Sequence, residues 1–159
     1  PAMLLYDEGL EPPFVAFVSV VVGSPSPGAG AGLAIASRGI GEVTVARITV
    51  GEGLVVERVV EGRTIEVGRA ECEIAAETWY VIVFSPSGRS AVVRLFDPEA
   101  GDELVAKVTL DTRATEPGRV GLWVGEAGEA WFPYLGILPL EPGYMGRVGA
   151  GGRAPDESL

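Results

Sequence analysis

The sequence predicts an all-β fold, a two-sheet antiparallel β-sandwich of the jelly-roll type. Short runs of β-branched and aromatic residues recur about every ten residues, and glycine and proline bound them. No stretch shows the period of an amphipathic helix. With 159 residues, 47% of them hydrophobic, the chain can fill one core without metal or disulfide. We therefore expect a sandwich domain at residues 1–140 and a glycine-rich tail or linker at 141–159.

Each run of this kind is expected to be a strand: 14–22, 31–37, 43–50, 54–60, 64–74, 79–85, 90–96, 103–110, 119–124 and 131–138. The connectors 51–53, 61–63, 87–89 and 98–102 have the glycine-containing composition of hairpin turns, so most neighbouring strands should be antiparallel. Within 64–74 the apolar phase changes at Gly68, which predicts a β-bulge. The segment from Gly23 to Gly30 is expected to be a flexible connection that can overhang a sheet face.

Alternation within the strands predicts which side chains are buried. In 103–110, Leu104 should share the core face with every second residue up to Leu110. By contrast, 79–85 is apolar on both faces until Ser85. This strand should be central in its sheet, or a partner or ligand should cover its outer face.

Composition excludes several classes of function. The chain has no histidine, asparagine or glutamine, so histidine-dependent nucleophiles, zinc sites and proton shuttles are absent. The missing amides, together with twelve prolines, suggest a heat-adapted source. The net charge of −10 disfavours nucleic acid as a partner. The longest apolar run, 14–22, is shorter than the roughly 20 residues needed to span a bilayer.

Cysteine usage adds little. Cys72 is the single cysteine, so no internal disulfide forms, and cysteine usage does not indicate the cellular compartment. It shares the apolar side of its expected strand with Ala70 and Ile74, where a thiol behaves as a small hydrophobic group.

The second half of the chain has a recognisable order of strands and turns. TWYVIVFSPSGRSAVVRLFDPEAGDELVAKVTLD is followed by TEPGRVGLWV and then by AWFPYLGIL, from Thr78 to Leu138. This order resembles concanavalin A-like (laminin G-like) sandwich domains. The resemblance implies two curved antiparallel sheets, the concave one often forming a carbohydrate-binding or catalytic groove. The sequence does not establish the location, and an extracellular or cell-surface location is slightly favoured.

Aromatic residues are the candidate ligand contacts, because flat rings provide stacking surfaces for sugars. Trp79 and Trp123 lie in strongly apolar strands and are expected in the core. Trp131 and Tyr134 are therefore the predicted ligand-binding residues. In one regular strand they would point to opposite faces, and we expect Trp131 to be the more exposed. Lectin sites of this fold also use asparagine, which this chain lacks.

Two acidic groups offer weaker candidate sites. Glu71 and Glu73 would share one strand face, as the paired carboxylates of retaining glycosidases do, but an ordinary solvated face explains them too. The carboxylates between Asp97 and Glu103 could bind calcium or simply form a charged hairpin tip. We assign no catalytic residue, metal or cofactor.

These observations lead to a non-enzymatic binding module, carbohydrate-binding and part of a larger protein, with a glycan or protein partner. A structural or assembly domain, including a homo-oligomer, is the first alternative, because a sheet that is apolar on both sides needs cover. A small glycoside hydrolase that uses Glu71 and Glu73 is the second.

Overall fold

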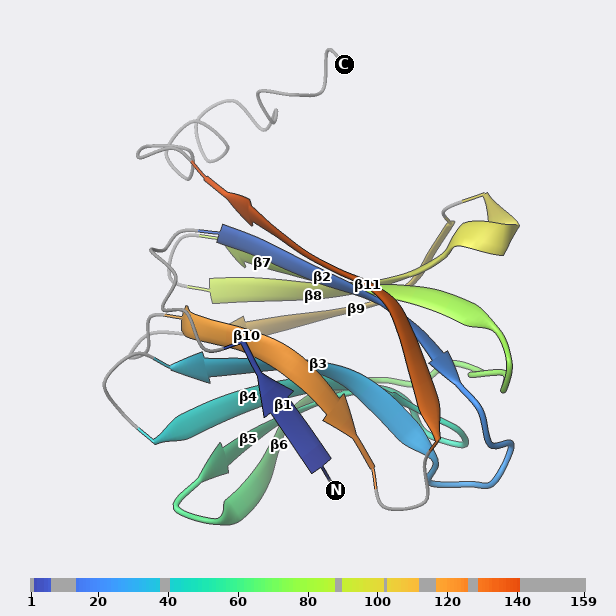
Figure 1. Ribbon diagram of the computed structural model, residues 1–159, viewed down its shortest axis with the longest axis horizontal. Helices are drawn as coiled ribbons and strands as arrows, with labels where there is room; N and C mark the ends of the chain where they lie inside the picture. Colours follow the sequence, from blue (N-terminus) through green and yellow to red (C-terminus); the bar gives the residue numbers. More distant parts are fainter. Residues whose placement is uncertain are drawn as a thin grey trace.

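The computed structural model describes residues 2–6, 14–37, 41–87, 90–101, 103–111, 117–125 and 129–140. Within these residues two antiparallel sheets pack face to face (Figure 1). Sheet A has the strand order β1 (Ala2–Leu5), β10 (Pro117–Val124), β3 (Gly30–Ser37), β4 (Glu42–Thr49), β5 (Gly53–Val60) and β6 (Arg63–Ala70). Sheet B has the order β11 (Ala130–Pro139), β2 (Phe14–Val22), β7 (Trp79–Ser87), β8 (Ser90–Asp97) and β9 (Glu103–Asp111). The predicted all-β sandwich is confirmed.

One hydrophobic core lies between the sheets. Its fully buried side chains alternate along the strands, as the two-residue period of a half-buried strand requires. The largest are Phe14, Leu33, Ile48, Leu54, Ile82 and Leu95. On β7, Tyr80 and Phe84 also point into this core. The strand is central in sheet B, as its two apolar faces predicted.

All ten expected strands are present, with ends that differ by a few residues at most. The expected strand 64–74 ends earlier, at Ala70, and its register against β5 shifts so that Val56 faces Gly68 while Glu57 faces Glu66. The predicted bulge therefore lies beside Gly68. The turn at 61–62 joins β5 to β6. A short 3-10 helix, η1 (Pro98–Ala100), joins β8 to β9, and Gly88, Arg89 and Asp102 lie outside the described residues.

Two expectations about this framework are wrong or incomplete. Strand β1 was not expected, and it adds an edge to sheet A by pairing with β10. Leu104 is 48% exposed because the β8–β9 register shifts beside Phe96, which places Leu104 on the outer face of sheet B. The connection from Gly23 to Gly30 crosses from β2 in sheet B to β3 in sheet A, and Gly28 donates to the Val50 carbonyl at 2.9 Å. The expected tail, 141–159, lies outside the described residues.

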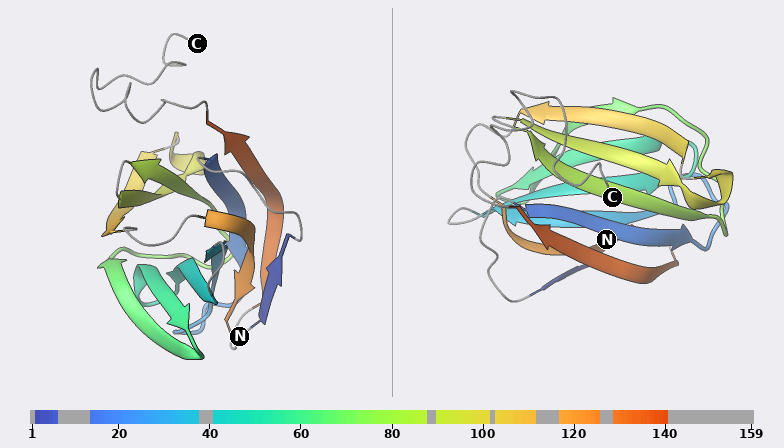
Figure 2. Two further views of the ribbon diagram at one scale, coloured as in Figure 1. Left: turned by 90° about the vertical axis from the view of Figure 1, so that its left-hand side faces the viewer. Right: turned by 90° about the horizontal axis from the view of Figure 1, so that it is seen from above.

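Figure 2 shows the two layers from the side and, in its right-hand view, the outer face of sheet B from β11 to β9. Each sheet thus has an outer face that is free of the sandwich core, and these two faces are where ligands could bind. In the part of the chain that the structure describes, no helix is long and apolar enough to cross a membrane.

Candidate functional site

The predicted ligand residues Trp131 and Tyr134 both lie on the outer face of sheet B. Trp131 pairs with Val21 and Tyr134 pairs with Ser19, two residues of β2 that face outward, because the β11 register shifts between the two aromatic residues. The expectation that they point to opposite faces is therefore wrong. The exposed fractions are 50% for Trp131 and 57% for Tyr134, so Trp131 is not the more exposed of the two.

The other aromatic expectation also needs correction. Trp79 is 42% exposed on the outer face of sheet B, and Trp123 is half-buried on the outer face of sheet A. Neither belongs to the core cluster between the sheets. Both occur in apolar strands, but on the positions that alternate with the core residues.

Among the described residues the acidic candidates do not assemble into a site, and Asp102 of the Asp97–Glu103 hairpin lies outside these residues. Glu71 and Glu73 are both exposed and follow the end of β6, so they do not share a strand face. The Asp97 carboxylate caps the 3-10 helix by accepting from the backbone N–H of Glu99 at 3.0 Å and of Ala100 at 3.3 Å. Among the described residues, no group of three or more acidic or cysteine side chains could hold a metal ion.

The outer face of sheet A brings together residues that lie far apart in the sequence. Trp123 of β10 pairs with Gly32 of β3, which pairs with Arg47 of β4. Arg47 in turn pairs with Val55 of β5, and Val55 pairs with Arg69 of β6. One row of cross-strand neighbours thus has an indole at one end and guanidinium groups in the middle and at the far end.

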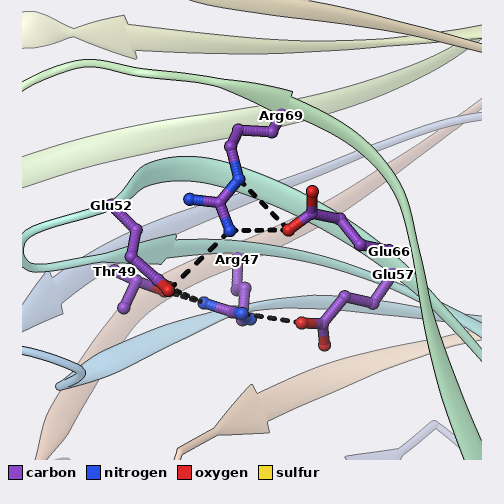
Figure 3. Close-up of polar contacts among 6 residues, drawn as sticks. All are labelled: Arg47, Thr49, Glu52, Glu57, Glu66 and Arg69. Carbon is purple, nitrogen blue, oxygen red and sulfur yellow. Dashed lines mark hydrogen bonds and ion pairs between the residues drawn. The ribbon is translucent and has the colours of Figure 1, made fainter.

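Arg47 is the centre of a polar network on this face (Figure 3). Its Nη2 donates to Glu57 Oε1 at 2.6 Å, and its Nη1 donates to Glu52 Oε2 at 3.0 Å and to the Thr49 hydroxyl. Its side chain is only 13% exposed, and that of Glu57 is 17% exposed. The guanidinium plane is therefore fixed by three partners before any ligand arrives.

A second arginine extends the network. Arg69 donates from Nε and Nη2 to Glu66 Oε1, at 3.1 and 2.6 Å, and its Nη2 lies 3.8 Å from Glu52 Oε1 (Figure 3). Glu52 therefore links the two arginines. We call Arg47, Glu52, Glu57, Glu66 and Arg69, with Trp123, the sheet A site.

The hydrogen bonds and charges of this site shift the pKa values of Arg47 and Glu66 in the directions that favour their ionised forms. Burial alone would lower the pKa of Arg47, but its hydrogen bonds and charge interactions with Glu57 and Glu52 raise that pKa above the ordinary value. The hydrogen bond from Arg69 lowers the pKa of Glu66. The site thus offers fixed N–H donors and carboxylate acceptors side by side on a sheet face.

Trp123 completes the site. The guanidinium carbon of Arg47 lies 5.8 Å from the centroid of the indole ring, within cation–π range. Gly32 separates the two residues in the row and has no side chain that would stand between them. The arrangement combines an aromatic surface with planar hydrogen-bonding groups.

Sequence reasoning did not find this site. Arg47, Glu57 and Arg69 are single charged residues within apolar or mixed strands, and none forms a motif with its sequence neighbours. The available signal was the alternation of side chains along each strand, because each of these residues occupies a position that alternates with the core residues of its strand. That alternation does not show which strands pair, so it could not show that these residues meet.

Comparisons with known proteins agree with the fold. No family model and no curated protein sequence matches the chain. Among solved structures, a carbohydrate-binding module, CBM66, from Bacillus subtilis matches with a TM-score of 0.70 and 13% identity over 86% of this chain and 80% of that chain.

Two further structures match. Sheep galectin-11 has a TM-score of 0.57 and 11% identity over 87% of this chain and 97% of that chain. A GH43 protein from Bacillus licheniformis has a TM-score of 0.57 and 12% identity over 80% of this chain but only 27% of that chain. The chain therefore has the concanavalin A-like jelly-roll sandwich fold that it shares with these carbohydrate-binding and lectin structures.

Proposed function

We propose that this chain is a non-enzymatic carbohydrate-binding domain that holds a sugar on the sheet A site. The observation that supports the proposal is the position of Trp123 beside the Arg47–Glu57 pair. An indole accommodates the C–H face of a sugar ring, while fixed guanidinium and carboxylate groups exchange hydrogen bonds with its hydroxyls. The likeness in fold to a carbohydrate-binding module and to galectins supports the same function.

The charges of the site favour a neutral sugar. Three carboxylates, Glu52, Glu57 and Glu66, surround the two guanidiniums of Arg47 and Arg69, so the network has an excess of negative charge. Each guanidinium is already engaged by carboxylates. An incoming sugar carboxylate would therefore be repelled, whereas hydroxyls can both donate to Glu and accept from Arg.

The arginine–carboxylate pairs can replace the hydrogen bonds that asparagine would make to a sugar, and this chain has no asparagine. An amide side chain offers one donor group and one acceptor in a plane. A guanidinium hydrogen-bonded to a carboxylate offers donors and acceptors in a similarly planar arrangement, and it does so without an amide that is lost at high temperature.

Binding to an array of neutral oligosaccharides tests the proposal. We expect Glu57→Gln and Trp123→Leu each to weaken the affinity for oligosaccharides by at least tenfold. The first removes a carboxylate acceptor and one of the three partners that hold Arg47, and the second removes the indole ring. Glu73→Gln is the matched control, since Glu73 is exposed outside the site. Failure of the folded protein to bind any glycan, or equal binding by all variants, would refute the proposal.

The same preparation tests the enzymatic alternative. We expect no release of reducing sugar from β-glucans. Hydrolysis that Glu73→Gln abolishes would instead show a glycosidase that uses this residue.

The assembly alternative depends on a different surface. The outer face of sheet B exposes Trp79, Leu104, Trp131 and Tyr134, an apolar area of the kind that often contacts a partner. Sedimentation velocity of the wild-type protein and of Trp131→Ala tests whether a second copy covers this face. A dimer that the substitution dissociates would support assembly.

A further inference from the structure

The outer face of sheet B has a second set of features, independent of the sheet A site. Its side chains form rows across the strands. Trp131, Val21 and Trp79 form one row, from β11 through β2 to β7. Tyr134, three residues further along β11, begins the next row, in which it pairs with Ser19, two residues from Val21 on β2. On β11, β2 and β7 the outward positions of these rows are uncharged.

The aromatic rings of this face lie against a glycine and against one another. The indole of Trp131 packs on Gly23 so closely that a methyl group added at the Gly23 Cα would come within 2.7 Å of the ring. The Tyr134 and Phe17 ring centroids are 5.4 Å apart, at an interplanar angle of 35°. Trp131 and Trp79 both pair with Val21, so their backbones are about 10 Å apart, two strand spacings. The rings thus form a broad platform that is open to solvent.

A pair of cations lies at the other side of the same face. Arg94 of β8 and Lys107 of β9 are direct cross-strand neighbours, and Lys107 is the single lysine of the chain. Like charges in this position repel each other. Neither has a salt bridge within the described part of the chain, although the protein has a net charge of −10. The outward residues beside them, Val92, Phe96 and Thr109, are uncharged.

This charge distribution indicates the chemistry of the occupant. A second copy that presented the same face would bring apolar residues or another cation pair against Arg94 and Lys107. A complementary ligand needs an anionic group for the cations and flat apolar surfaces for the rings. Sugar rings that bear carboxylate or sulfate groups have both.

The spacing indicates a ligand longer than a monosaccharide. Arg94 pairs with Val83, which lies four residues from Trp79 on β7. Trp79 and Arg94 are therefore about 14 Å apart along the face, from the rise per residue and the strand spacing. A ligand that contacts both must be an oligosaccharide or a polymer. The carboxylates of the same two strands, Asp97, Glu103 and Asp111, are three or four residues from the cations, about 10–14 Å along the strands. This separation exceeds the Debye length of about 8 Å at physiological salt, so a ligand that contacts Arg94 and Lys107 interacts most strongly with these cations.

We propose that the outer face of sheet B is a second glycan-binding surface, specific for anionic polysaccharides, in which Trp131, Trp79 and Tyr134 stack on sugar rings while Arg94 and Lys107 bind their carboxylate or sulfate groups. This surface lies on the opposite side of the sandwich from the sheet A site, so the two can be occupied together.

Affinity electrophoresis and calorimetry of the full chain with two matched pairs of polymers test the proposal. The first pair is polygalacturonate and its fully methyl-esterified form, and the second is dextran sulfate and dextran. We expect an anionic polymer to bind at least tenfold more tightly than its neutral counterpart. Binding of the first pair alone would identify carboxylate, and binding of the second pair alone would identify sulfate.

Variants connect binding to this face. Arg94→Ser with Lys107→Ser should weaken the anionic polymer at least tenfold and leave binding of neutral oligosaccharides at the sheet A site unchanged. Trp131→Ala should weaken the anionic polymer as well, and Arg63→Ser, an exposed arginine on sheet A, should not. Circular dichroism checks that every variant is folded.

Three results would overturn the proposal. These are equal binding of the charged and neutral polymers, anionic binding that survives both sheet B variants, and a dimer that Trp131→Ala dissociates. Loss of neutral-sugar binding in Glu57→Gln with retained polygalacturonate binding would confirm that the two sites are separate.

Discussion

Gly32 provides the sharpest test of how sheet A is built. It lies in β3 between Trp123 and Arg47, and a methyl group at its Cα would come within 2.0 Å of the Ala46 carbonyl oxygen and 2.7 Å of the Arg47 Cα. Ordinary carbon–oxygen contacts are about 3.3 Å or longer. The atoms in the way belong to the backbone of the neighbouring strand, so no side chain can rotate to make room.

Gly32→Ala must therefore push β3 away from β4 by about 1 Å, which stretches ladder hydrogen bonds from about 2.9 Å towards lengths at which they no longer form. We expect a loss of about 3 kcal/mol in the free energy of unfolding, the upper end of overpacking penalties. For a domain of this size the melting temperature should fall by about 6–12 °C. Sugar binding at the sheet A site should weaken too, because Trp123 and Arg47 would separate.

Gly41→Ala is the control, since nothing lies within 4 Å of the added methyl group and its φ is not positive. It should stabilise the protein by about 0.4–1 kcal/mol through a less flexible unfolded chain. Urea unfolding followed by tryptophan fluorescence measures both variants. If Gly32→Ala lies within about 0.5 kcal/mol of the wild type, the close approach of β3 to β4 is wrong.

Three further predictions concern single groups. Arg69 lowers the pKa of Glu66, so the stabilising ion pair is present above the ordinary glutamate pKa of about 4.3 and is lost only as the pH falls through the lower folded-state pKa. In Arg69→Met the pKa of Glu66, followed by NMR, should rise, and an unchanged titration curve would contradict the pairing. Burial raises the pKa of the Cys72 thiol, so iodoacetamide should alkylate it at least tenfold more slowly at pH 8 than in the urea-unfolded chain, whereas equal rates would show an open thiol. The Nε atom of Arg58 lies 3.3 Å from Glu42 Oε1, and its Nη2 donates to the Asp111 carbonyl of β9, so this side chain connects sheet A to sheet B. Arg58→Met should therefore lower the free energy of unfolding in urea by about 1–3 kcal/mol, and a change near zero would show that this connection does not stabilise the fold.

Most of the framework could be predicted from the sequence because it depends on local patterns. The strands from 14–22 to 131–138 follow from β-branched runs between turn residues, and the bulge beside Gly68 follows from a change of apolar phase. Strand β1 was not predicted because its four residues, Ala2–Leu5, show no alternation of apolar and polar residues and lie at an exposed edge of sheet A. Edge strands lack the burial that produces a pattern.

The predicted direction of a side chain was wrong where the register between two strands shifts. A bulge inserts one residue, and one residue reverses the face on which every following side chain lies. This is why Leu104 is on the outer face and why Trp131 and Tyr134 share a face. The expectation that Trp79 and Trp123 belong to the core failed for a different reason, because apolar residues occupy both faces of their strands.

The sequence alone determined the all-β class, the position of nearly every strand, and the absence of histidine chemistry, since each depends on composition or on the two-residue period of one strand. Only the tertiary structure decided that Arg47, Glu57 and Arg69 meet beside Trp123, and that Arg94 meets Lys107. The physical reason is that neighbours across a sheet are fixed by which strands pair and in which register. Those pairings join residues that lie far apart in the chain, and no local pattern encodes them.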